Sequence, residues 1–210
     1  HIECFKPGDK VRVMSVASER VLYVRPIDKK FQELLKTIEE HAEKAANLTD
    51  LPDINNTALA LYGKRWCRAQ ILDTFETDSK DNNVLCFLLD FGVYQKYPWN
   101  TLKRLGYKYR AIPRHTFKVI LADVKICNMT DEIEKYLTDM KKNNENLIAL
   151  KVDLRGSDRY VELKREGETQ TINEVIRQMS NMVSDTESCE RILFDVSSER
   201  FYKLYEIYQP

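Results

Sequence analysis

The stretch that most constrains the fold of this chain is residues 58–105, where short apolar runs alternate with turns. Two β-like runs, residues 66–72 and 84–89, are separated by a polar loop, and a third run, residues 94–98, follows a turn at Gly92. Glycine adopts the backbone dihedrals that such a tight bend requires. Short strands joined in this way predict a small antiparallel barrel.

The segments before the barrel predict two strands and one long helix. Residues 10–16 alternate apolar and polar side chains, and residues 20–25 form a second β-like run that Pro26 ends. From residue 28 the apolar period becomes three to four residues, which predicts a helix over residues 28–46 with one apolar face. That face consists of Phe31, Leu34, Leu35, Ile38, Ala42 and Ala45.

The segments after the barrel predict a strand, a helix, a hairpin and a second helix. Residues 116–126 alternate as a strand, and Thr130 is a helix N-cap with acidic residues in the turn that follows. Residues 147–155 and 159–165 flank a Gly-Ser-Asp turn, which predicts a hairpin. The last helix is indicated by Ile172, Val175, Ile176, Met179 and Met182.

Composition excludes several classes of function. Lys and Arg number 33 and Asp and Glu also number 33, which argues against a strong general affinity for nucleic acid. The 5 cysteines show no CxxC pairing, which favours a reduced, intracellular protein. No apolar run is long enough to cross a bilayer, so we expect no membrane partner.

Two phrases in the barrel stretch resemble the Tudor family. WCRA at residues 66–69 and LDFGV at residues 89–93 match the family pattern of WYRA followed by I/L-D-Y-G-N in order and spacing. Trp66 is out of phase with Cys67 on a strand, so we expect Trp66 to pack on the opposite face. Asp90 either fixes the turn or contacts a ligand.

The whole arrangement resembles an extended Tudor domain. The resemblance implies a β-rich α+β fold, in which a Tudor-type small β-barrel and a split OB lobe similar to staphylococcal nuclease are joined by a long helix. We expect the extended Tudor domain at residues 1–182, the barrel core at 58–105, the OB-like lobe at 5–26 and 111–182, the connecting helix at 28–46, and a C-terminal extension at 183–210 that is helical from 197.

In this family, four aromatic side chains and one asparagine enclose a dimethylated arginine by cation–π attraction. Carried over by motif, these positions fall at Leu61 (with Tyr62 beside it), Cys67, Leu88, Phe91 and Val93. Only Phe91 is aromatic. We therefore predict that the chain does not select methylated arginine. A displaced cage of Tyr62 and Tyr94 around Phe91 remains open.

The resemblance implies a function. Family members bind the arginine-rich N-terminal tails of Piwi-class Argonautes, so we expect a non-catalytic peptide-binding module for an unmethylated tail. The candidate contacts are Leu61, Tyr62, Cys67, Leu88, Asp90, Phe91, Val93 and Tyr94. An acidic loop with Asp73, Glu76, Asp78 and Asp81 either steers a basic peptide or is only a solvated tip. The family also implies the piRNA pathway, a cytoplasmic location and a perinuclear germ granule (nuage).

Catalysis is not expected. A nuclease-like lobe would need clustered carboxylates to hold a metal ion, but Asp123 and Asp153 are isolated in the sequence. The histidines and cysteines show no metal-site spacing, and Cys67 and Cys86 suit small core positions. We expect no metal and no cofactor.

Two further interpretations remain open. Lys103, Arg104, Tyr107 and Lys108 interleave cations with an aromatic ring, as single-stranded RNA binders do, although the same side chains suit packing. A third possibility is scaffolding by self-association. It would use Phe201, Leu204, Tyr205 and Tyr208, which share one face of the helix expected in the extension.

Overall fold

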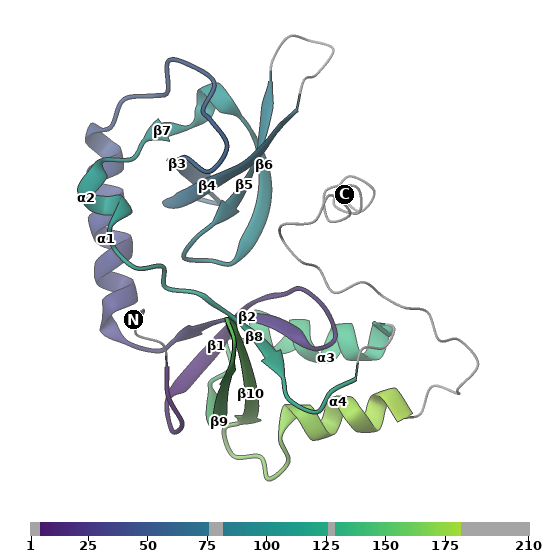
Figure 1. Ribbon diagram of the computed structural model, residues 1–210. Helices are drawn as coiled ribbons and strands as arrows, with labels where there is room; N and C mark the ends of the chain where they lie inside the picture. The colour runs from purple at the N-terminus through teal and green to yellow at the C-terminus, as the bar shows by residue number, and fades with distance from the viewer. Residues whose placement is uncertain (1–4, 76–81, 126–128, 182–210) are drawn as a thin grey trace. The chain divides into compact units, whose positions relative to one another are not determined.

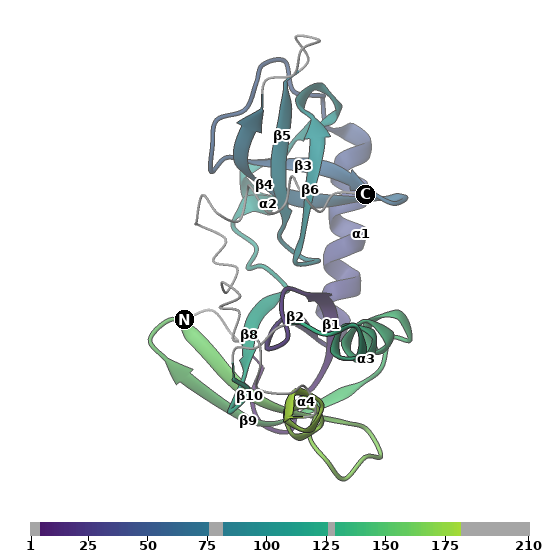
Figure 2. The same ribbon diagram turned by 90° about the vertical axis from the view of Figure 1, so that its right-hand side faces the viewer.

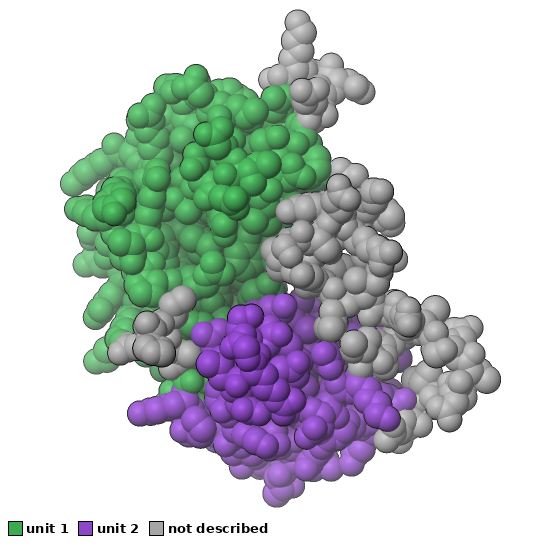
Figure 3. Space-filling model, in the orientation of Figure 1, with its two compact units in different colours: residues 1–5, 9–15, 23–117 green, residues 6–8, 16–22, 118–210 purple. Residues whose placement is uncertain are grey.

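The computed structural model describes residues 5–75, 82–125 and 129–181 (Figure 1). The chain forms two compact units: residues 1–5, 9–15 and 23–117 make unit 1, and residues 6–8, 16–22 and 118–210 make unit 2 (Figure 3). The acidic residues Glu76, Asp78 and Asp81, and the helix expected from residue 197, lie outside the described residues.

Unit 1 contains a sheet in the strand order β6-β5-β4-β3-β7. Each neighbouring pair in this sheet is antiparallel. Strands β4, β5 and β6 confirm the three predicted runs. The sequence pattern had not indicated β3 as a strand, yet it pairs with β4 along its full length. The strands are β3 (Thr57–Tyr62), β4 (Arg65–Phe75), β5 (Asn83–Leu88), β6 (Val93–Pro98) and β7 (Lys103–Arg104).

The two faces of this sheet bury different side chains. Cys67 and Leu88 lie in one core cluster, which is built mainly of small and aliphatic residues. Trp66 packs against a second cluster, in which Leu59 of β3 meets the apolar face of a helix. Neighbouring residues of a strand point to opposite faces. The predicted separation of Trp66 from Cys67 is therefore confirmed.

The helix of the second cluster is α1 (Lys29–Lys44), which lies alongside the sheet (Figures 1 and 2). Asp28 caps it by accepting a hydrogen bond from the Phe31 backbone N–H at 3.3 Å. The predicted apolar stripe is buried, and its members include Leu34 and Ile38. Each large aliphatic side chain buried in this way stabilises the fold by about 1.5–3 kcal/mol.

The other sheet is a closed barrel in the order β1-β2-β8-β10-β9. β10 pairs parallel with β8 and antiparallel with β9, so the predicted hairpin around Gly156 is confirmed. The strand expected over residues 116–126 is shorter, because β8 ends at Leu121. The strands are β1 (Lys10–Val16), β2 (Val21–Pro26), β8 (Phe117–Leu121), β9 (Leu147–Arg155) and β10 (Asp158–Arg165).

The described part of unit 2 contains the helices α3 (Asp131–Lys142) and α4 (Ile172–Asn181) (Figure 2). Thr130 caps α3 as predicted, since its hydroxyl accepts from the Ile133 N–H at 3.2 Å. The buried Asn173 of α4 accepts from the Leu163 N–H and donates to the carbonyls of Ala122 and Val161. This amide ties α4 to the strands.

Within the described ranges, no helix has the length and apolar character needed to span a membrane.

Candidate peptide-binding site

The turn after β5 has a backbone that only glycine fits well. The Gly92 N–H donates to the Leu88 carbonyl at 2.8 Å, and the φ angle of Gly92 is +66°. A Cβ atom at this position would lie 2.6 Å from the Cβ of Tyr23. The turn therefore needs glycine both for its dihedrals and for the close approach of β2.

Asp90 and Arg68 form a buried ion pair beneath this turn. The residues are 2% and 1% exposed. Arg68 Nε and Nη2 donate to the two carboxylate oxygens at 2.8 and 2.7 Å. The Asp90 carboxylate also accepts from the His115 backbone N–H at 2.9 Å. Asp90 thus holds the turn in place, and its carboxylate is occupied by groups of the chain itself.

Arg68 uses its remaining N–H groups on backbone carbonyls. Nη1 donates to the carbonyls of Tyr109 and Ile112, and Nη2 donates to that of Pro113. Together with the two bonds to Asp90, these contacts use all five N–H donors of the guanidinium. In the sequence, Arg68 is recognisable only as part of the WCRA motif. An arginine inside an apolar strand pattern is the signal that could have indicated a buried partner.

Two of the cage positions lie in the core on one face of the β6-β5-β4-β3-β7 sheet. Cys67 and Leu88 are fully buried, and the Cys67 thiol donates to the Ala60 carbonyl at 3.3 Å. Burial raises the pKa of the Cys86 thiol to about 12. Burial, the Asp90 carboxylate and the Cys86 thiol together raise the pKa of the Cys67 thiol. Both thiols are therefore protonated and unreactive at neutral pH.

Phe91 is partly buried and lies beside two other rings. Its centroid is 5.5 Å from that of Tyr62 and 5.8 Å from that of Phe31. Phe31 was predicted only as a core residue of the helix. The guanidinium carbon of Arg25 lies 3.8 Å from the Phe31 centroid. The face of the Phe31 ring, beside Phe91, is therefore covered by the guanidinium group of Arg25, a residue of the chain itself.

Of the remaining cage-related residues, Leu61 is exposed, and Val93 and Tyr94 are half-buried. Leu61 is 44% exposed. Val93 pairs with Leu88 in the sheet and packs against the core below it. The Tyr94 ring lies tilted against the Phe87 ring, with their centroids 4.8 Å apart, and the Tyr94 hydroxyl shares a hydrogen bond with that of Tyr23 at 3.1 Å. This contact of Tyr94 with Tyr23 had no signal in the local sequence.

The four residues considered for RNA have different environments. Lys103 Nζ donates to the Ala42 carbonyl at 2.8 Å and lies 4.6 Å from the centroid of the Trp66 ring. The Lys103 side chain therefore caps a carbonyl in the last turn of α1 and packs on Trp66. Tyr107 is 86% exposed, and Arg104 and Lys108 are also exposed. The Lys103 side chain is therefore half-buried against the chain, whereas Arg104, Tyr107 and Lys108 are exposed at the surface.

Among the residues that the structure describes, no group of three or more His, Cys, Asp or Glu side chains could hold a metal ion.

The Tudor domain family model matches residues 6–123, which is more than half of the chain. The chain therefore belongs to the Tudor domain family, and its fold is that of an extended Tudor domain. No curated protein matches the sequence.

Solved extended Tudor domains share this fold. The domain of BmPAPI is 19% identical, with a TM-score of 0.71 over 83% of this chain and 98% of that one. The Drosophila melanogaster Papi domain is 20% identical, with a TM-score of 0.71 over 82% and 97%. The human TDRD1 domain is 19% identical, with a TM-score of 0.69 over 85% and 91%.

Proposed function

We propose that this chain is a non-catalytic module that binds the arginine-rich N-terminal tail of a Piwi-class Argonaute in unmethylated form. Tudor domains are binding modules rather than enzymes. An Asp-to-Ala variant of the Drosophila melanogaster Papi domain was solved with a Piwi N-terminal peptide in a dimethylated and in an unmethylated form. A mouse TDRD1 domain was solved with a MILI peptide that contains dimethylarginine. These complexes support a peptide as the class of ligand.

One observation supports the unmethylated form: of the four cage positions that are aromatic in the family, only Phe91 carries a ring here. Cys67 and Leu88 are fully buried, and neither is aromatic. A single cation–π contact contributes about 0.5–1 kcal/mol at an exposed site, which is too little to select a methylated guanidinium. Enclosure by several rings would be needed for that selection.

The accessible surface around Phe91 suits the alkyl stem of an arginine. Tyr62 and Val93 provide apolar area there, whereas Leu61 points to the opposite face of β3. Arginine stems pack on such apolar surfaces while the charged head stays in water. Arg25 already lies against Phe31, and burial, then the neighbouring Arg12, lower the pKa of Arg25 to about 10, while Asp28 raises it. Arg25 therefore remains charged at neutral pH. The head of a bound arginine would point to solvent, away from this like charge.

Titration of two matched peptides tests the proposal. The peptides share one Argonaute-type arginine–glycine sequence and differ only in symmetric dimethylation of the central arginine. We expect the two dissociation constants to agree within about threefold, because no ring cage rewards the methyl groups. A preference of more than about tenfold for the methylated peptide would contradict the proposal, as would the absence of binding by both.

A variant locates the contact. Phe91→Ala should weaken the unmodified peptide about fivefold, which corresponds to the loss of one ring contact. Leu150→Ala, at an exposed position of β9, is the matched control and should leave the affinity unchanged. Equal effects of both variants would exclude the Phe91 surface.

The family and the Papi-like relatives also support a wider setting for this proposal, namely the piRNA pathway and cytoplasmic, perinuclear germ granules (nuage). Imaging of the tagged full-length protein in germ cells would test this location.

A further inference from the structure

The loop between α1 and β3 is held as an arch. At its first end, the Arg104 N–H donates to the Ala46 carbonyl at 2.8 Å. At its second end, the Asn55 N–H donates to the Ile71 carbonyl at 2.7 Å. Because the hydrogen bonds at both ends are to the backbone of neighbouring strands, residues 47–57 form a wall that exists before any ligand arrives.

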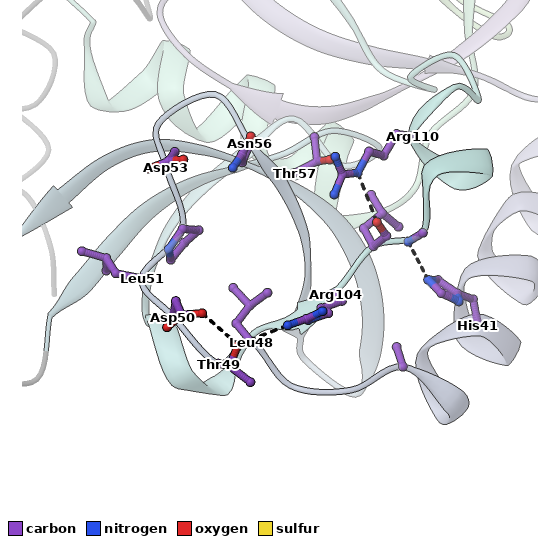
Figure 4. Close-up of a pocket in the computed structure, with 14 residues that line it drawn as sticks. His41, Leu48, Thr49, Asp50, Leu51, Asp53, Asn56, Thr57, Arg104 and Arg110 are labelled. Atoms are coloured by element: carbon purple, nitrogen blue, oxygen red, sulfur yellow. Dashed lines mark hydrogen bonds between the residues drawn. The ribbon is translucent and has the colours of Figure 1, made fainter.

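Behind this wall lies a cavity of about 490 Å³, which we name the loop pocket (Figure 4). This volume falls within the range of about 300–1,000 Å³ that is typical of ligand sites. Its apolar lining includes Leu48, Pro52 and Leu105. Every residue of the pocket belongs to unit 1, and none of them is a cage position.

The two ends of the loop pocket carry opposite charges. Asp50 and Asp53 lie toward one end and Arg110 lies toward the other, while the Arg104 guanidinium reaches Thr49 beside Asp50 (Figure 4). Arg104 Nη2 donates to the Thr49 hydroxyl at 3.1 Å, and Arg110 Nε donates to a backbone carbonyl at 3.1 Å. Among the described residues, these are the side-chain hydrogen bonds of the two guanidinium groups. Each therefore keeps N–H donors for a ligand.

A buried hydroxyl at the basic end lacks a partner. Thr57 Oγ1 is buried and makes no hydrogen bond within the described residues, and Figure 4 shows the Thr57 side chain beside Arg110. Buried polar atoms are nearly always paired in native structures, because an unpaired one loses its hydration without compensation. A ligand oxygen held by Arg110 would pair with this hydroxyl once the side chains that cover it shift.

The loop that walls the pocket carries exposed apolar side chains. Leu51 lines the pocket and is 40% exposed, and Ile54, in the same loop but outside the lining, is 52% exposed. Large aliphatic side chains exposed together on one loop are typical of a surface that a partner covers.

We propose that the loop pocket binds a short segment of a protein partner in which an aliphatic side chain is followed directly by an acidic one. The aliphatic group packs on Leu48 and Pro52, and the carboxylate is bound by Arg110. Guanidinium groups bind carboxylates through paired, charge-assisted hydrogen bonds. A nucleic acid suits the pocket less well, because Asp50 and Asp53 repel phosphates at the opposite end.

The proposal is independent of the Argonaute-tail contact at Phe91, and it is tested by NMR titration of the complete 210-residue chain. The probes are capped tetrapeptides with Leu, Ile, Val or Met followed by Asp or Glu, each matched to a peptide with Asn or Gln. We expect saturable shifts of the amides of residues 47–57 and of Gly106. The acidic peptides should bind about tenfold more tightly than the amide peptides, because only a carboxylate pairs with the Arg110 guanidinium group.

Variants separate this site from its surroundings. Arg110→Gln should weaken the acidic peptides about tenfold. Lys108→Gln, on the same short helix α2 (Tyr107–Arg110) but outside the loop pocket, should not. Neither variant should change the titration of the arginine peptides at Phe91. Equal binding of acidic and amide peptides, shifts confined to other surfaces, or no binding at millimolar concentration would overturn the proposal. So would displacement of the peptides by a single-stranded oligouridylate that binds the same residues more tightly.

Discussion

The turn at Asp90 and the loop pocket both use arginine, but in opposite ways. Arg68 is buried, and all five of its N–H donors are bound by a carboxylate and by backbone carbonyls. Arg104 and Arg110 are exposed, and each makes one side-chain hydrogen bond within the described residues. An arginine whose donors are all used inside the chain stabilises the fold, whereas one that keeps them is available to a ligand.

The largest expected effect tests the buried side of this comparison. Asp90→Asn leaves the Arg68 charge buried without its counter-ion, so the free energy of unfolding should fall by about 3–5 kcal/mol in urea denaturation. The control is Asp139→Asn, which breaks an exposed pair with Lys135 on α3. That change should cost less than about 1 kcal/mol. Equal losses in the two variants would show that burial of the Asp90 pair adds nothing.

A smaller effect is expected from the turn itself. Gly92→Ala places a Cβ atom 2.6 Å from the Cβ of Tyr23 and forces alanine into a positive φ. Overpacking and left-handed strain together should lower the free energy of unfolding by at least about 2 kcal/mol. Gly156→Ala is the control, because its φ is similarly positive but no atom lies within 4 Å of the added Cβ. A loss no greater than that of the control would show that Tyr23 yields to the new methyl group.

The smallest effect concerns the loop-pocket side. His41 Nε2 accepts from the Gly106 N–H at 3.0 Å. Burial and then the Lys108 charge lower the pKa of His41 from 6.5, while a backbone hydrogen bond acts in the opposite direction. Because the folded state binds this proton less readily than the unfolded chain, the contribution of neutral His41 is fully present above pH 6.5. It declines as the pH falls through the lowered folded pKa.

Thermal melts at pH 7.5 and pH 5.5 measure this dependence. The melting temperature of the native chain should fall more steeply between the two pH values than that of a His41→Gln variant, in which the proton-binding group is absent. Parallel slopes would show that His41 does not couple to stability.

Much of the fold could be predicted because its signals are local. Apolar alternation indicated β4 to β6, the three-to-four-residue period indicated α1, and Thr130 marked the start of α3. The motif spacing around Gly92 located the turn, and it showed that three of the four aromatic cage positions, Leu61, Cys67 and Leu88, carry no ring. Each of these signals depends on residues within a few positions of one another, where periodicity and turn chemistry act directly.

The candidate site was less predictable because its contacts are distant in sequence. Arg68 binds carbonyls that lie more than 40 positions away. The Tyr23 hydroxyl meets that of Tyr94 across 71 positions. No local pattern encodes such pairs, since they arise only when separate strands are brought together.

The sequence by itself determined the strands, the helices and the glycine turn, because each follows from local chemistry. It also determined that Leu61, Cys67 and Leu88 leave three of the four aromatic cage positions without a ring. The tertiary structure decided which polar groups became internal and which stayed accessible. It buried Arg68 against Asp90, placed Arg25 on Phe31, and left Arg104 and Arg110 at the loop pocket. The physical reason is that a side chain's hydrogen-bond donors are used by whichever partners the folded chain brings within reach.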